Sequence, residues 1–192
     1  MTRVRRLLLA LLLGLGLTLG AWPAVATEPF PRTSARWQTC VKKTVDGAER
    51  KQGSMTTPRG TYTITETFGN GPAPYTSMPY HQTRKGDYWV GDNSSRYYNT
   101  LRNSSQGGFR WWLARSNRNS SENLRAYGAQ YRYVAVINVN RPPDTQEAYR
   151  GYGIFLHVKN GTDTAGRIGI TAGQVEQVLR YLRPGDKITI RR

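Results

Sequence analysis

The sequence predicts one mainly β domain, a sandwich or barrel with one or two short helices. Its 192 residues suffice for one ordinary domain and are few for two. Short runs rich in Tyr, Val, Ile and Thr alternate with turns of Gly, Pro and Asn, which is typical of strands. A single stretch near the C-terminus has helical periodicity, and no internal repeat is visible.

The first 26 residues are typical of a signal peptide. Three arginines precede an uncharged, leucine-rich run from Leu7 to Leu19, and Ala24-Val25-Ala26 supplies the small-x-small cleavage pattern. An uncleaved anchor is the alternative, but the apolar run is barely long enough to span a bilayer. We therefore expect cleavage after Ala26, no membrane span afterwards, and a secreted or cell-wall, extracytoplasmic location.

Residues 27–36 are expected to be a flexible lead-in, and residues 37–192 to be the folded domain. After residue 26, 25 basic and 12 acidic side chains remain, a net charge of +13. Such a charge attracts polyanions, and export favours an anionic wall or membrane face over nucleic acid. A basic surface that only keeps the protein soluble is the alternative.

Cysteine and histidine counts exclude some classes of site. Cys40 is the only cysteine, so no intramolecular disulfide can form, and a disulfide-rich scaffold is excluded. With only two histidines in addition, a structural zinc site is not expected. We predict no metal site, and nothing in the sequence indicates an organic cofactor.

The first strong strand pattern is "GTYTITETF", from Gly60 to Phe68. Its alternation predicts threonines on one side and Tyr62, Ile64, Glu66 and Phe68 on the other.

Further strands are predicted at "QYRYVAVINVN" (Gln130 to Asn140), "GIFLHV" (Gly153 to Val158) and "DKITI" (Asp186 to Ile190). The second of these is a compact apolar run, typical of a buried central strand. The polar, aromatic segment 88–124 predicts long loops with short strands over a cleft.

One helix is well indicated. Thr171 and Gln174 have the spacing of a capping box, and Pro184 and Gly185 provide a stop. The apolar face of this helix would contain Val175, Val178, Leu179 and Leu182.

The segment "GIFLHVKNGTDTAGRIGI" contains the candidate chemistry. His157 follows the buried run, and "KNGTDTAG" predicts a hairpin that returns position 167 to the histidine. Gly166 would allow a close backbone approach, and the amides beside it could form an oxyanion hole. A histidine base facing a nucleophile on such a turn is an arrangement used for acyl transfer.

This segment resembles the catalytic signature of YkuD-type L,D-transpeptidases of the actinobacterial branch, in which cysteine occupies the Arg167 position. Three further segments match in order: "GSMTTPRGTYTITETFG", with its TP-x-G strand entry; "MPYHQTRKGDYWVGDNSSRYYN", with its PY, D-x-W and YN groups; and the terminal helix with "LRPGDKITI". The resemblance extends from about Trp37 to Ile190.

The resemblance implies a β-rich fold and cysteine acyltransfer on peptidoglycan stem peptides at the cell wall. His157 would be the base, Arg167 would occupy the nucleophile position, and Thr164 and Gly166 would flank the nucleophile and its oxyanion hole. Substrate binding is assigned to residues in the matched segments, Tyr80, His81, Tyr98 and Asn99. For the tyrosines, and for Trp89 and Tyr97 nearby, core and loop packing is the alternative.

An arginine at position 167 changes the functional prediction. A guanidinium stays protonated near neutral pH and offers only donors, so it cannot form an acyl intermediate. Cys40 lies outside the nucleophile motif, and the Thr164 hydroxyl would need a strong base. We therefore expect a catalytically impaired protein that retains binding to stem peptides and the wall, with Arg167 pairing a substrate carboxylate.

Two alternatives stay open. An active L,D-transpeptidase would require another nucleophile, or cysteine in place of this arginine, a change of one base. A secreted basic module for another polyanion, such as nucleic acid or acidic lipid, would use the arginines and aromatic residues for charge and stacking. The oligomeric state is not indicated by the sequence.

Overall fold

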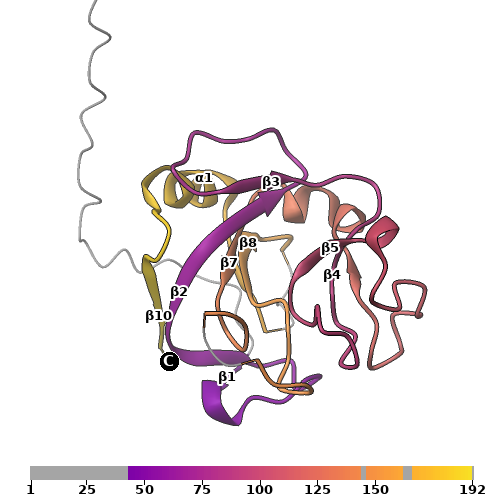
Figure 1. Cartoon of the computed structure of the whole chain (residues 1–192). Coiled ribbons are helices and arrows are strands. Elements are labelled where there is room, and N and C mark those ends of the chain that lie inside the picture. The colour runs from indigo at the N-terminus through magenta and orange to yellow at the C-terminus, as the bar shows by residue number, and fades with distance from the viewer. Residues whose placement is uncertain (1–42, 144–145, 162–165, 192) are drawn as a thin grey trace, which may run out of the picture. The chain divides into compact units, whose positions relative to one another are not determined.

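The computed structural model describes residues 43–143, 146–161 and 166–191. The predicted signal peptide, the lead-in, Cys40 and Thr164 lie outside these ranges. The described chain is mainly β, which confirms the predicted class (Figure 1). The strands do not close into a barrel, so of the two predicted architectures the barrel is not formed.

The elements follow in chain order. The strands are β1 (Thr44–Asp46), β2 (Thr57–Gly69), β3 (Tyr80–Gln82), β4 (Asp87–Trp89), β5 (Leu101–Asn103), β6 (Glu122–Asn123), β7 (Val134–Ile137), β8 (Phe155–Val158), β9 (Ile168–Ile170) and β10 (Lys187–Ile190). The α-helix is α1 (Ala172–Tyr181), and short 3-10 segments are η1 (Gly47–Glu49), η2 (Ser104–Gln106) and η3 (Leu124–Tyr131).

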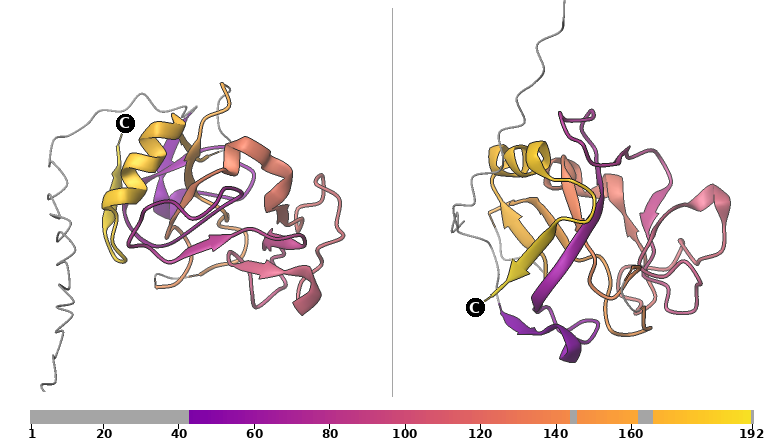
Figure 2. Two further views of the ribbon diagram at one scale, coloured as in Figure 1. Left: turned by 90° about the horizontal axis from the view of Figure 1, so that it is seen from above. Right: turned by 60° about the vertical axis from the view of Figure 1, so that its left-hand side comes forward.

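The strands form two sheets. The larger has the order β1-β2-β7-β8-β9, and β3 and β10 also pair with the long strand β2. The smaller has the order β5-β4-β6 and contains the segment predicted as loops with short strands. Helix α1 and strand β10 lie at one end of the described domain, and β4 and β5 lie at the other (Figure 2).

Strand β2 departs from the predicted alternation. Its pairing with β7 shifts between Ile64 and Thr67, an irregularity of the β-bulge kind. Ile64 therefore packs in the cluster under α1, whereas Phe68 packs in the aromatic cluster on the other side of the sheet. The prediction that both face the same side is wrong, because an extra residue in the strand changes the face of every side chain after it.

Strand β7 is shorter than predicted. Tyr131, which was predicted to be in the strand, ends η3, and the backbone N–H of Val139 donates to the carbonyl of Ile137, which turns the chain out of the sheet. All four β7 side chains are buried, with Val134 and Val136 on the aromatic side and the other two on the helix side. The sheet is therefore covered on both faces at this strand.

Helix α1 begins as predicted. Thr171 and Gln174 form a complete capping box, in which each side chain bonds the other residue's backbone N–H. Val175, Val178 and Leu179 are buried against the sheet, and the helix ends at Tyr181 before Pro184. The helix therefore covers one face, and the opposite face carries the site described below.

Candidate active site beside a basic pocket

His157 and Arg167 lie on the same face of the large sheet. Leu156 pairs with Ile168 and His157 with Gly169, so β8 and β9 are parallel neighbours. Because side chains alternate along a strand, His157 and Arg167 share the face of Phe155, opposite α1. The predicted hairpin is wrong, because a hairpin joins antiparallel strands and these two strands are parallel. The two residues nevertheless lie on one face of adjacent strands.

The His157 side chain is fully buried and its tautomer is determined by one contact. Nδ1 lies 2.8 Å from the carbonyl oxygen of Val158, so Nδ1 carries the proton that it donates. Nε2 is therefore the basic nitrogen, and it has no hydrogen-bond partner among the described residues. Burial lowers the pKa of His157, against a smaller opposing effect of the Val158 carbonyl, which keeps the imidazole neutral at pH 7.

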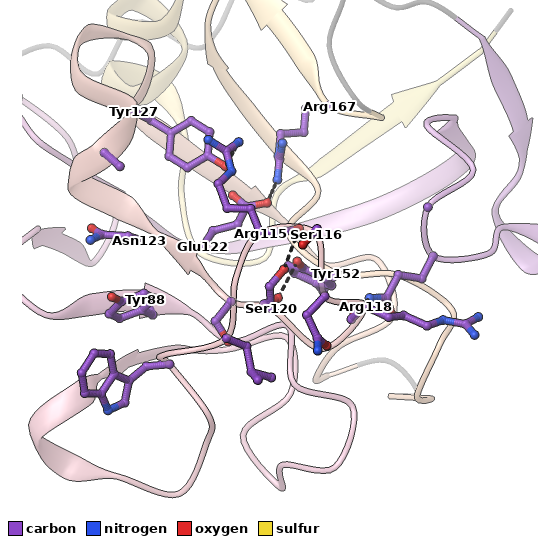
Figure 3. Close-up of a pocket in the computed structure, with 18 of the residues that line it drawn as sticks. Tyr88, Arg115, Ser116, Arg118, Ser120, Glu122, Asn123, Tyr127, Tyr152 and Arg167 are labelled. Carbon is purple, nitrogen blue, oxygen red and sulfur yellow. Dashed lines mark hydrogen bonds and ion pairs between the residues drawn. The ribbon is translucent and has the colours of Figure 1, made fainter.

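Arg167 is paired within the protein. Its Nε donates to the carbonyl of Gly153 at 2.9 Å, and Nη2 forms an ion pair with Oε1 of Glu122 (Figure 3). The other carboxylate oxygen of Glu122 accepts from the Tyr131 hydroxyl at 2.9 Å. The Arg167 and Glu122 side chains are only 12% and 13% exposed. A substrate carboxylate was expected as the partner of Arg167, and in the structure Glu122 takes that place.

The charge of Arg167 persists at neutral pH. Burial, with repulsion from Arg50 and Arg115, lowers the pKa of Arg167 to about 10, which is still well above 7. A protonated guanidinium has no lone pair to attack a carbonyl, so Arg167 can bind and orient but cannot form a covalent intermediate.

Gly166 and Gly153 let the backbone pass close to these side chains. Gly166 has a φ of +86°, and a Cβ there would lie 2.5 Å from the Thr56 carbonyl oxygen, so no larger residue fits without displacement. Gly153 has a φ of +63°, and its carbonyl holds Arg167. The close approach predicted at Gly166 is thus observed, while Thr164 lies outside the described residues.

A pocket of about 670 Å³ opens beside Arg167. Its walls come from the segments 50–55, 111–127 and 151–152, with Tyr88 from β4. The residues labelled in Figure 3 are Tyr88, Arg115, Ser116, Arg118, Ser120, Glu122, Asn123, Tyr127, Tyr152 and Arg167. His157 does not line this pocket, because it is covered by the aromatic cluster around Tyr131.

Asn99 and Tyr98, predicted to bind substrate, are buried and do not line the pocket. The Asn99 amide oxygen accepts from Trp89 Nε1 and the Gly153 N–H, and its nitrogen donates to the carbonyls of Val139 and Asn140. All its hydrogen-bonding capacity is thus used by the protein.

Tyr98 is similarly enclosed. Its hydroxyl accepts from the Gly151 N–H, and burial raises its pKa to about 12. In the structure, Tyr98 and Asn99 accept hydrogen bonds from the Gly151 and Gly153 N–H groups beside Arg167, and their role in substrate binding stays a prediction.

Tyr80 and His81, the other two predicted binding residues, lie on β3 and are also absent from the pocket walls. The Tyr80 hydroxyl donates to the carbonyl of Gly71, and His81 Nε2 lies 2.7 Å from Oδ2 of Asp87. The structure therefore does not bring these residues together with Arg167, and their role in binding stays a prediction. Trp89, fully buried, packs against Phe68 and Phe155, which is the packing alternative.

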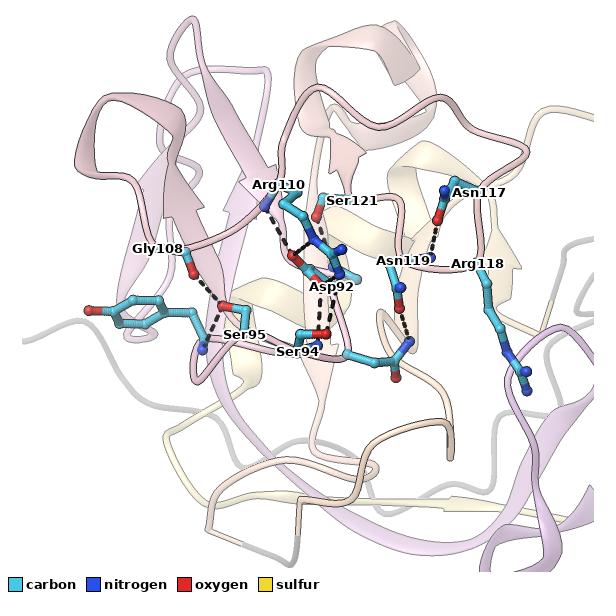
Figure 4. Close-up of polar contacts among 12 residues, drawn as sticks. Asp92, Ser94, Ser95, Gly108, Arg110, Asn117, Arg118, Asn119 and Ser121 are labelled. Carbon is cyan, nitrogen blue, oxygen red and sulfur yellow. Dashed lines mark hydrogen bonds and ion pairs between the residues drawn. The ribbon is translucent and has the colours of Figure 1, made fainter.

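An internal ion pair shapes the loop that walls the pocket. Asp92 accepts from the backbone N–H, Nε and Nη2 of Arg110, at 3.0, 2.8 and 2.5 Å (Figure 4). These contacts, the strongest of which is the Arg110 side chain, lower the pKa of Asp92. Asn119 accepts from the Asn93 side chain at 2.9 Å, which ties the loop to the same turn.

Sequence reasoning missed Glu122 and the arginines around it. Between residues 90 and 143 the chain has only two acidic residues, Asp92 and Glu122, among eight arginines. Each of the two is buried against one arginine in the structure. An isolated carboxylate in a strongly basic segment was the signal, because such a residue is rarely buried without a partner.

Two searches of the described ranges gave no site of another class. No group of three or more metal-ligating side chains is present there. No helix in the same ranges is long and apolar enough to cross a membrane.

Comparison with known proteins decides the family. The family model YkuD, described as the L,D-transpeptidase catalytic domain, matches residues 32–190. The chain belongs to the YkuD family. Searches of curated proteins and of solved structures found no match. The YkuD match covers every strand described above, and it agrees with the mainly β architecture.

Proposed function

We propose that this YkuD-family protein is exported, binds peptidoglycan stem peptides, and does not transfer acyl groups. Arg167 stands where the resemblance expects the nucleophilic cysteine. The observation that carries the proposal is the ion pair of Arg167 with Glu122, supported by the Gly153 carbonyl. These contacts integrate the arginine into the protein and leave no nucleophile at that position.

The other parts of an acyl-transfer site are consistent with a former enzyme. His157 is neutral, with Nδ1 fixed by Val158 and with no partner for Nε2 among the described residues, the state that a general base needs. A thiol at position 167 would lie on the same face as this imidazole and could give it a proton. Arg167 cannot, so removal of this one group is expected to reduce catalysis by orders of magnitude.

Retention of binding is supported by charge and by the pocket. Among its lining residues are four arginines and one glutamate, so the pocket is electropositive. The net charge of +13 after residue 26 favours retention on an anionic wall, an effect that falls with ionic strength. Export rests on the signal-peptide pattern of residues 1–26.

The proposal is tested on the mature protein, residues 27–192. We expect it to be retained on purified sacculi at moderate salt, and to produce no cross-linked dimers from tetrapeptide muropeptides by mass spectrometry. A Cys40→Ala variant controls for the only thiol in the chain. Loss from sacculi together with retention on DNA-cellulose would support a different polyanion, and dimers from the unmodified protein would contradict the loss of catalysis.

A further inference from the structure

The charges that line the pocket do not balance. Arg50, Arg115, Arg118 and Arg167 contribute four positive charges, and Glu122 contributes the only negative one. Glu122 is already paired with Arg167, so three arginines have no acidic partner within the described ranges.

Arg50 has a structural role. Its side chain is buried, and it donates from Nε to the Thr56 carbonyl at 2.9 Å and from Nη1 to the Arg150 carbonyl at 3.2 Å. Carbonyl oxygens satisfy these donors without cancelling the charge. Arg50 therefore adds positive potential beneath the pocket while being unavailable as a free clamp.

Arg115 is exposed and is held on an aromatic platform. Its guanidinium lies 5.7 Å from the ring centroid of Tyr127, and it has only a long, 3.5 Å contact with the Tyr127 hydroxyl. Tyr127 stacks on Tyr131, with 4.3 Å between centroids, and the Tyr131 hydroxyl bonds Glu122. The guanidinium therefore lies beside Tyr127 on the Arg167 side of the pocket (Figure 3).

Arg118 lies farther along the same loop. It stacks over Tyr149, 4.9 Å from the ring centroid, and its backbone carbonyl is bonded by Gln52. It also has no acidic partner among the residues described. Arg115 and Arg118 thus present two unneutralised guanidinium groups on the exposed wall of one pocket.

We infer that this pocket is a carboxylate-binding site, in which Arg115 binds a free carboxylate of an acidic peptide and Arg118 supports it from the outer wall. A guanidinium forms paired, charge-assisted hydrogen bonds with a carboxylate, and a neutral carboxamide cannot match them. The inference rests on the proposed function and refines it: the protein distinguishes stem peptides with free carboxylates from amidated ones. Repulsion between Arg115 and Arg167 also favours binding of an anion, because a bound anion would relieve it.

The test compares two pairs of peptides by calorimetric titration at low and moderate salt. The first pair is a tetrapeptide stem with free carboxylates and the same peptide with all carboxylates amidated. The second is Ala-Glu-Glu-Ala and Ala-Gln-Gln-Ala, which share the charge difference without the stem chemistry. We expect the free acids to bind about tenfold or more tightly, and salt to reduce the difference.

Variants assign the effect to a residue. Arg115→Gln should remove the preference, and Arg115→Lys should keep part of it, since a point charge remains. Arg84→Gln is the matched control, because Arg84 is exposed and lies outside the pocket. Unchanged unfolding midpoints in all three variants would separate binding from stability.

Each outcome decides one claim. Equal affinity for free and amidated stems would overturn the carboxylate site and leave stem binding intact. Preference for Ala-Glu-Glu-Ala without binding of either stem would support the carboxylate site and contradict the proposed function. A preference that survives Arg115→Gln would refute the assignment to Arg115.

Discussion

Removal of one charge of the Arg167–Glu122 ion pair should destabilise the domain more than removal of both charges. The two side chains are 12% and 13% exposed, and loss of one partner removes the opposite charge from a poorly solvated group. In Glu122→Gln, Arg167 would also stay exposed to repulsion from Arg50 and Arg115. We expect each single variant, Arg167→Met or Glu122→Gln, to lower the free energy of unfolding by about 3 kcal/mol.

The double variant should cost much less than the sum. An apolar methionine and a neutral glutamine leave no isolated charge, so we expect a loss of about 2 kcal/mol and a coupling free energy of about 4 kcal/mol. Urea unfolding followed by tryptophan fluorescence measures these values. With a slope near 2 kcal/mol/M, a single variant would shift the midpoint by about 1.5 M.

A surface pair provides the control. Glu147 and Arg150 are 56% and 33% exposed, so Glu147→Gln should cost less than about 1 kcal/mol. This prediction is refuted if the losses in free energy of unfolding are additive, with no coupling above the experimental error. The ion pair would then not be a structural contact in place of the former nucleophile.

Three further predictions concern residues around the site. Burial holds the pKa of His157 below its ordinary 6.5, so the unfolded chain binds more protons than the folded one in mild acid. The urea midpoint should therefore decrease as the pH is lowered from about 7 to 5, and it should decrease less in His157→Gln. Asn99→Ala should lower the free energy of unfolding by about 3 kcal/mol, by stranding buried donors and acceptors, without changing stem-peptide affinity below the transition, as titration would show. The lowered pKa of Asp92 gives stability that is present above its usual 3.8 and lost in stronger acid; Asp92→Asn should remove it and speed amide exchange in the loop 110–121, whereas unchanged exchange would contradict the role of the Arg110 contact.

Structural elements that are determined by residues close together in the sequence were predicted correctly. The capping box at Thr171 and the buried run before His157 are visible as patterns in the chain, and both appear in the structure as expected. The face of Phe68 was predicted incorrectly, because a bulge depends on how two strands pair and leaves no clear trace in one of them. The direction of β9 was also predicted incorrectly, because a short connection between strands favours a hairpin and the strands are parallel instead.

The site could be predicted only in part. His157 and Arg167 were recognisable from their segment, and the parallel pairing of β8 and β9 places them on one face. Glu122 is 45 residues from Arg167 along the chain, and only the fold joins them. Asn99 was assigned to substrate binding from a matched segment; in the structure its amide makes four contacts with the protein, one of them to the Gly153 N–H, and its role in binding stays a prediction.

The most direct test of the central claim is the intact mass of two proteins after incubation with tetrapeptide stems, the unmodified chain and Arg167→Cys. We predict an acyl adduct on the cysteine variant alone, and its loss when His157→Ala is added. An adduct on the unmodified chain would contradict the proposal that Arg167 abolishes acyl transfer. An unreactive cysteine variant that is folded and binds stems would contradict the claim that the rest of the site is competent.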